Sequence, residues 1–207
     1  MINIIFQDAD LIIVEKPHDV LSVPGKGPEK QDCLISRLVE QGFPSALIVH
    51  RLDFATSGLM VVALNKAMHK ALSMLFQNRQ ISKRYHALLG GIPTTDSGAV
   101  HQPLRCDWEN RPLQIVDYQW GKKALTHWQI LQRFEDYVSV LLSPETGRSH
   151  QLRVHMQWLG HSILGDRFYA QGAALAKSNR LCLHASHLGF IHPGTGQPLN
   201  FDSASPF

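Results

Sequence analysis

The sequence is short of the features that mark secreted, disulfide-bonded and membrane-spanning proteins. Its three cysteines, Cys33, Cys106 and Cys182, are odd in number and far apart, which fits neither a disulfide framework nor a zinc motif. The longest apolar runs, such as residues 59–64, are too short to span a bilayer. The first residues lack the basic region of a signal peptide and are soon followed by two aspartates. We therefore expect a cytoplasmic protein.

Carboxylates are missing from a long central stretch. No Asp or Glu occurs from residue 54 to residue 95, so Asp53 is the only carboxylate between Glu40 and Asp96. Nearby positive charge favours the ionised form of such an isolated acid. Two interpretations stay open for Asp53: a functional carboxylate, or a turn residue leading into residues 56–58. The basic residues of the stretch are Lys66, Lys70, Arg79, Lys83 and Arg84.

Metal-ligating and nucleotide-binding patterns are also scarce. There is no HExxH motif, and His150 and His155 are spaced so that they fall on different faces of a helix. No glycine motif for nucleotide binding occurs either. A hydrolase that used Asp53 with Asp166 or the histidines would need a paired acid or a ligand cluster, and the spacing offers no clear example of either. We expect no metal site.

The composition that remains is that of a globular protein, with 44% hydrophobic and 18% charged residues in a chain of 207. The formal net charge is only +3, but it is unevenly distributed. Residues 1–50 carry four Lys or Arg and seven Asp or Glu, whereas residues 51–100 carry six and two. A basic region on a balanced chain fits a phosphate-rich ligand, and a solvated basic helix face explains it equally well.

Hydrophobic patterning predicts strands and helices without an internal repeat or a linker. Helices are expected after Asp32, Asn65 and Ser149 as N-caps, and the first and third end at Gly42 and Gly160. Because strands outnumber helices and hairpins dominate, we predict an α+β fold with a mainly antiparallel mixed sheet. Residues 92–121 give no clear assignment. The strands are expected at residues 2–6, 11–14, 59–64, 82–89, 123–134, 137–142 and 181–191, and after the turn at 193–196.

Several polar clusters stand out, and each has a plain structural explanation when it is taken alone. Taken together and in order, they resemble the RluA family of RNA pseudouridine synthases. The resemblance covers nearly the whole chain. It rests on Lys16-Pro17, Leu21-Ser22-Val23-Pro24-Gly25, His50-Arg51-Leu52-Asp53-x-x-Thr56-Ser57-Gly58, Lys83-Arg84-Tyr85-His86-Ala87, Thr146 to His155, His161-x-Ile163-Leu164-Gly165-Asp166, Leu181 to Ala185, and His192-Pro193.

The resemblance implies a fold and a reaction. The fold is the pseudouridine synthase fold, a central mixed sheet flanked by helices with an active-site cleft across it. The reaction breaks the N1–C1′ bond of a uridine in RNA and rejoins the base through C5. Asp53 aligns with the family's nucleophile, which attacks C1′ of the ribose or C6 of the base. Arg148 aligns with the arginine that holds this aspartate, and Tyr85 with the tyrosine that stacks on the base.

The resemblance also implies an RNA-binding set. Arg51 aligns with the residue that helps to fill the place of the flipped base, a task that suits a planar, charged side chain. The basic residues from Lys66 to Arg84 are expected to position the RNA backbone. Leu183 is expected to line the uracil pocket. The full RNA-binding set is His50, Arg51, Thr56, Lys83, Arg84 and Leu183.

Further expectations concern the substrate and the organisation of the chain. An isomerisation of this kind calls for no cofactor, and residues 1–207 are expected to form one catalytic domain, with no room for an N-terminal S4-like domain. We expect a monomer without an obligate protein partner that recognises a compact stem-loop. Residues 105–112 are similar to the family members that act on 23S rRNA and on tRNA anticodon stem-loops. The alternative is a non-catalytic RNA-binding protein or RNA chaperone with the same fold.

Overall fold

The computed structural model describes all 207 residues, which fold into two compact units. Unit 1 consists of residues 1–83 and 184–206, and unit 2 consists of residues 84–183 with Phe207. The elements in chain order are β1 (Asn3–Gln7), β2 (Leu11–Lys16), η1 (Pro28–Lys30), α1 (Leu34–Glu40), β3 (Leu47–Ile48), β4 (Ser57–Ala63), α2 (Lys66–Gln77), β5 (Ser82–Gly90), β6 (Ser97–Val100), β7 (Leu104–Cys106), β8 (Gln114–Val116), β9 (Thr126–Arg133), β10 (Tyr137–Pro144), α3 (Gln151–Trp158), α4 (Gly172–Ala176), β11 (Leu183–Ile191) and β12 (Pro198–Asp202).

No linker joins the two units. The chain leaves unit 1 between Lys83 and Arg84, inside β5, and returns between Leu183 and His184, inside β11. Because both passages lie within strands, neither shows the Pro, Gly or polar composition that marks a domain boundary in a sequence. This explains why the sequence gives no sign of the division.

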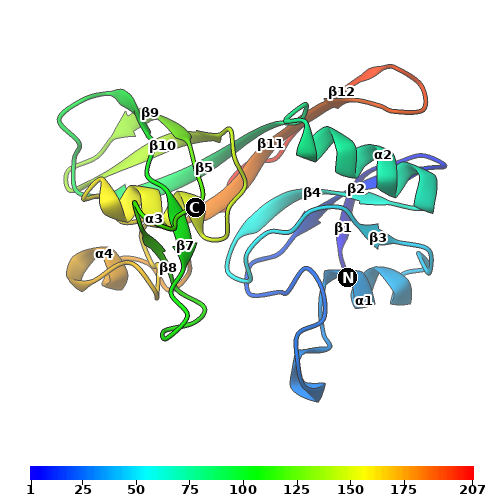
Figure 1. The fold of residues 1–207 in the computed structure, drawn as a ribbon, viewed down its shortest axis with the longest axis horizontal. Helices are drawn as coiled ribbons and strands as arrows, with labels where there is room; N and C mark the ends of the chain where they lie inside the picture. The colour runs from blue at the N-terminus through cyan, green and yellow to red at the C-terminus, as the bar shows by residue number, and fades with distance from the viewer. The chain divides into compact units, whose positions relative to one another are not determined.

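In unit 1 the strand order is β1-β2-β4-β11, with β3 on β4 and β12 on β11. The pairing of β4 with β11 is parallel, and the others are antiparallel. Every residue of β4 is buried, so both faces of this strand are covered. Helices α1 and α2 lie on opposite sides of the unit 1 strands (Figure 1). The core under α2 combines Met68 and Leu72 with strand residues such as Leu11, Val61 and Leu188.

The helix caps in unit 1 show which local predictions hold. Asn65 caps α2, because its side chain accepts a hydrogen bond from the Met68 N–H at 2.8 Å, as predicted. The prediction that Asp32 caps α1 is wrong. Cys33 occupies that position and exchanges hydrogen bonds with Ser36, whereas the Asp32 carboxylate pairs with Arg37 at 2.6 and 2.7 Å. The charged, bidentate contact with Arg37 is stronger than a hydrogen bond from a helix N–H would be, so the carboxylate binds Arg37 and does not cap the helix.

In unit 2 the strand order is β5-β10-β9-β6, all antiparallel, with a separate ribbon of β7 and β8. The predicted hairpin around residues 135–136 is confirmed by the pairing of β9 with β10. Ser149 does not cap α3. His150 precedes the helix in a left-handed conformation with φ of 51°, which places Ser149 outside it. The ribbon, β6 and α4 lie in segments for which the sequence gives no prediction.

No helix in the chain has both the length and the apolar character needed to span a membrane.

Candidate active site

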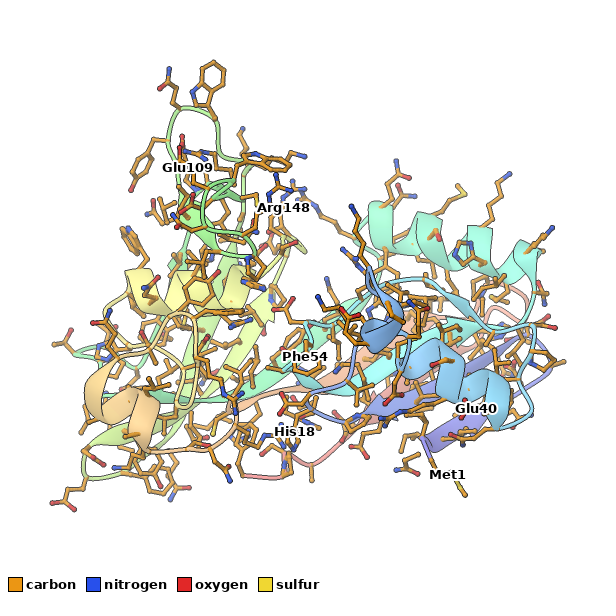
Figure 2. The ribbon with its side chains drawn as sticks, turned by 90° about the horizontal axis from the view of Figure 1, so that it is seen from below. Met1, His18, Glu40, Phe54, Glu109 and Arg148 are labelled. Atoms are coloured by element: carbon orange, nitrogen blue, oxygen red, sulfur yellow. The ribbon has the colours of Figure 1, made fainter.

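Asp53 lies in a turn that immediately precedes β4. Its backbone carbonyl accepts a hydrogen bond from the Thr56 N–H at 3.1 Å, and its side chain is half-buried. The turn interpretation of the sequence is therefore correct for the backbone. This backbone hydrogen bond closes the turn, and the functional interpretation of the carboxylate remains compatible with it. Phe54, the next residue, is exposed and is labelled in Figure 2.

The two neighbours of Asp53 are held by buried groups of unit 1. On one side, the Ser22 hydroxyl donates to the Leu52 carbonyl at 2.9 Å and accepts from the Leu52 N–H at 3.2 Å. On the other side, the Lys16 ammonium donates to the Phe54 carbonyl at 3.1 Å. Since the backbone is fixed immediately before and after Asp53, the position of its Cα is set by residues far away in the sequence.

Lys16 is the residue of this site that sequence reasoning missed. Its side chain is completely buried, and its ammonium also donates to the carbonyls of Pro17 at 2.8 Å and Val20 at 2.7 Å. A buried ammonium is costly unless hydrogen bonds compensate it, and three carbonyls supply them here. The motif Lys16-Pro17 was the available signal, but it gave no hint of a contact with the turn of Asp53.

Ser57 and Gly58 anchor the turn to β11. Gly58 has a φ of +117°, and a Cβ at this position would lie 2.4 Å from the Ala185 carbonyl oxygen. Only glycine permits both the conformation and the close parallel pairing of β4 with β11. The Ser57 hydroxyl lies 2.9 Å from Nδ1 of buried His184, whose Nε2 lies 2.9 Å from the Ser203 hydroxyl. Ser203 in turn donates to Glu15 of β2. A polar chain, buried at Ser57 and His184, therefore connects four segments: β4, β11, the residues after β12, and β2.

His50 was predicted to bind RNA, and the structure shows that it also has a structural role. Its Nε2 accepts a hydrogen bond from the Val61 N–H at 3.1 Å, and its ring stacks on Phe76 with centroids 4.4 Å apart. Burial and, secondarily, the charge of Lys83 lower the pKa of His50 to about 3. The neutral ring that results is required, because a protonated Nε2 could not accept the Val61 hydrogen bond.

The other predicted RNA-binding residues differ in their exposure. Arg51 is exposed and Arg84 is half-buried. Lys83 is half-buried above the Phe76 ring, 5.9 Å from its centroid, and burial lowers the pKa of its ammonium. Thr56 and Leu183 are only 2% and 3% exposed. For Thr56 the observed role is the backbone hydrogen bond that closes the Asp53 turn.

Arg148, in unit 2, precedes α3 in a tightly bonded loop. Its Nε donates to the Lys123 carbonyl at 3.2 Å, and its backbone N–H donates to the Gln151 side chain at 3.0 Å. That amide is itself buried and receives a hydrogen bond from the Thr146 hydroxyl at 2.7 Å. The guanidinium is exposed, so a fixed backbone carries a charged group that faces solvent. Figure 2 labels Arg148 together with Glu109, which lies in the loop between β7 and β8.

Tyr85 lies in β5 of the same unit. Its Cα is paired with that of Leu142 in β10, and its side chain is half-buried. The next residue, His86, hydrogen-bonds the Ser139 hydroxyl through Nε2 at 2.6 Å and stacks on Phe207. The sheet thus fixes the backbone that carries the tyrosine.

Two groups named by the hydrolase alternative are engaged elsewhere. Asp166 forms a buried, bidentate pair with Arg153 at 2.8 and 2.7 Å. His155 hydrogen-bonds Thr126 through one ring nitrogen and the Gln102 carbonyl through the other, both at 2.9 Å. No group of three or more His, Cys, Asp or Glu side chains is arranged to hold a metal ion. Asp166 and His155 therefore have evident structural tasks.

Comparison with known proteins identifies the family to which these motifs belong. The profile of the RNA pseudouridylate synthase family matches residues 10–158. The chain belongs to this family. It is 48% identical to the dual-specificity RNA pseudouridine synthase RluA of Yersinia pestis, over 99% of each chain. It is 46% identical to the protein of the same name from Escherichia coli K12, over 99% of this chain and 93% of that protein.

A solved structure agrees on the fold. Human RNA pseudouridylate synthase domain containing 1 superposes with a TM-score of 0.83 at 29% identity, and the match covers 100% of this chain and 84% of the human one. The predicted family, the α+β pseudouridine synthase fold and the enzyme class, an isomerase that acts on RNA, are thereby confirmed. The roles of individual site residues stay predictions.

Proposed function

We propose that the protein converts specific uridines to pseudouridine in structured RNA, in 23S rRNA, in tRNA anticodon stem-loops, or in both. Relatives of nearly the same length are named dual-specificity enzymes, which favours two kinds of substrate. The observation that carries the proposal is the fixation of Asp53. The backbone on both sides of this carboxylate is held by buried groups, Ser22 and Lys16. Such preorganisation is expected of a nucleophile.

Asp53 acts as the nucleophile in this proposal, at C1′ of the ribose or at C6 of the base. The N1–C1′ bond breaks and a C5–C1′ bond forms; C5 loses a proton and N1 gains one. Arg148 keeps the carboxylate ionised and directed through its planar, permanently charged guanidinium. Tyr85 stacks on the base. The isomerisation is redox-neutral and releases no fragment, so the proposal requires no cofactor.

The RNA-binding set contains residues that contact RNA directly and residues that support them. Arg51 is exposed and fills the place that the flipped uridine leaves, at an unstacking cost of a few kcal/mol. Lys83 and Arg84 contact the RNA backbone, and Leu183 lines the uracil pocket. His50 and Thr56 serve this set indirectly, by holding β4 and the Asp53 turn in place.

The organisation of the protein completes the proposal. The two units act as a single catalytic domain, and the protein works as a monomer without an obligate protein partner. Its place is the cytoplasm, where the three free cysteines suit a reducing environment.

The test compares Asp53→Asn with the wild-type protein. Product is measured as release of label from RNA carrying tritium at C5 of uridine, and RNA affinity is measured by filter binding. We expect product formation to fall to background while the dissociation constant changes by no more than about twofold, because phosphate contacts supply much of the affinity. Asp96→Asn, which removes an exposed carboxylate paired with Arg133, is the matched control. Turnover at the wild-type rate by Asp53→Asn would rule out the proposed mechanism.

A further inference from the structure

The β7–β8 ribbon is rooted in the core of unit 2. Leu104 of β7 is buried in a cluster with Val154 of α3 and Tyr169, and Val116 of β8 packs against the same cluster. The Tyr169 hydroxyl also accepts a hydrogen bond from the backbone N–H of Gln114 at 2.9 Å. We call residues 104–123 the aromatic arm. Its base is thus held by packing and hydrogen bonds.

Beyond this base, the aromatic arm exposes three large rings. Trp108 is 64% exposed, Tyr118 75% and Trp120 71%. Rings of this size normally contribute burial to a core or an interface, so three in a short segment indicate a binding surface. Neither strand of the ribbon needs them for pairing, since all three lie in the loops that follow β7 and β8.

The loops that carry the rings are ordered by their own polar contacts. Asp117 accepts hydrogen bonds from the N–H groups of Gln119 at 2.8 Å and Trp120 at 2.7 Å, and it pairs with Arg105. The Arg105 guanidinium lowers the pKa of the Asp117 carboxyl and keeps it charged. The rings are therefore presented in advance, which reduces the entropy that binding would cost.

The aromatic arm carries four basic side chains against three acidic ones, a small excess of positive charge; the basic ones are Arg105, Arg111, Lys122 and Lys123, and the acidic ones are Asp107, Glu109 and Asp117. The Arg111 guanidinium lies 4.1 Å from the centroid of the Trp108 ring, and the Arg111 side chain is exposed. Lys122 and Lys123 are exposed as well. The negative charge of Asp117 is balanced by its ion pair with Arg105. Aromatic rings beside exposed cations are the combination with which proteins hold unpaired nucleotides, by stacking the base and contacting its phosphate.

The geometry points to the aromatic arm as a set of stacking positions for unpaired nucleotides that flank the target uridine in the RNA substrate. Trp108 with Arg111, Tyr118 and Trp120 stack bases, and Lys122 and Lys123 meet phosphates. The Lys123 carbonyl holds Nε of Arg148, so the arm is joined directly to the residue assigned to the reaction. Figure 2 shows the segment around Glu109 extending away from the strands of unit 2. This inference rests on the proposed function, since it requires an RNA with a loop.

The test measures the binding of two RNAs to full-length variants. One probe is a short RNA hairpin with an unpaired loop, and the other is a fully paired RNA duplex of equal length. We expect Trp108→Ala and Trp120→Ala each to weaken hairpin binding roughly tenfold, because stacking on an aromatic ring contributes strongly for each base. Duplex binding should change by less than about twofold, because it depends on phosphate contacts.

The matched control is Trp158→Ala, which removes a tryptophan that is 49% exposed on α3, outside the arm. This variant should bind the hairpin as the wild type does. Arg111→Lys keeps the charge but loses the stacking plane, so we expect it to weaken hairpin binding nearly as much as Arg111→Ala. As a second readout, hairpin RNA should quench the tryptophan fluorescence of the wild type more than that of Trp108→Ala.

Three results would overturn the inference: unchanged hairpin affinity in both arm variants, an equal loss for hairpin and duplex, or the same loss in Trp158→Ala. Self-association of the wild type that the arm variants abolish, with RNA affinity unchanged, would assign the surface to a second copy of the chain instead. None of these measurements depends on turnover. A failure of the Asp53→Asn prediction and a failure of this inference are therefore distinguishable.

Discussion

The Lys16 ammonium lies 3.1 Å from the carbonyl oxygen of Phe54, the residue that follows Asp53. These two groups are 38 positions apart in the chain. A fully buried cation thus holds the backbone next to the proposed nucleophile, while its other hydrogen bonds hold residues 17–20. Two tasks are therefore separate. Lys16 fixes the backbone beside Asp53, and the carboxylate itself is left to other partners.

Lys16→Met should lower both stability and turnover. Methionine fills the volume but leaves three carbonyls without this donor, and we expect a loss of about 3 kcal/mol in the free energy of unfolding. Turnover should fall more than RNA affinity, because the Asp53 turn loosens while the phosphate contacts remain. Urea denaturation and single-turnover kinetics measure the two effects. Lys70→Met, at an exposed position of α2, is the control and should stay within about 0.5 kcal/mol. Equal stabilities of the two variants would contradict the role of Lys16.

Gly58→Ala should be among the most damaging single changes in unit 1. The new Cβ would lie 2.4 Å from the Ala185 backbone, so β4 and β11 must separate. Gly42→Ala is a close control, because Gly42 also has a positive φ of +99° but no atom within 4 Å of the added Cβ. We expect Gly42→Ala to cost about 1 kcal/mol from backbone strain alone, and Gly58→Ala to cost several times more. Comparable thermal melting temperatures would show that the close approach of the strands is not limiting.

His50 should make the protein less stable in acid. Its folded pKa of about 3 is lower than the ordinary value of 6.5, so the unfolded chain takes up this proton first. The stabilisation is complete above about pH 6.5 and is lost as the pH falls from there towards 3. Between about pH 7 and pH 5 we expect His50 to account for about 1–2 kcal/mol of the decrease. His50→Gln keeps an acceptor for the Val61 N–H but does not titrate, so its urea midpoint should depend less on pH. An identical pH dependence would exclude His50 as the cause.

Arg148→Lys should reduce the rate of the chemical step sharply, by about tenfold or more, because an ammonium replaces a planar, bidentate partner. The dissociation constant for RNA should change little, since the charge is retained. Single-turnover kinetics separate the two quantities. Arg133→Lys, which changes an exposed arginine of β9, should leave both unchanged. A wild-type rate in Arg148→Lys would mean that the hydrogen bond to Lys123 is the whole role of this residue.

A local rule predicted a helix cap correctly where no nearby side chain competed for the capping group, and features that depend on distant contacts were not predicted. Asn65 caps α2 because its partner is three residues away. Asp32 was assigned to a cap by the same local rule, but Arg37 offers its carboxylate an ion pair. The strands of the aromatic arm are too short to show a pattern, and it is packing against α3 that fixes them. Lys16 was missed for the same reason, because its carbonyl partner at Phe54 is far along the chain.

The division of unit 1 into two chain segments has a consequence for biosynthesis. Residues 184–206, which supply nearly all of β11 and the whole of β12, are translated after residues 84–183 of unit 2. Until they emerge, Ser57 lacks His184 and Gly58 lacks the Ala185 backbone, although Lys16 and Ser22 are already present. The Asp53 turn can therefore be completed only after residues 184–206 have been synthesised. A nascent chain that has not reached these residues therefore lacks the finished turn that carries the proposed nucleophile.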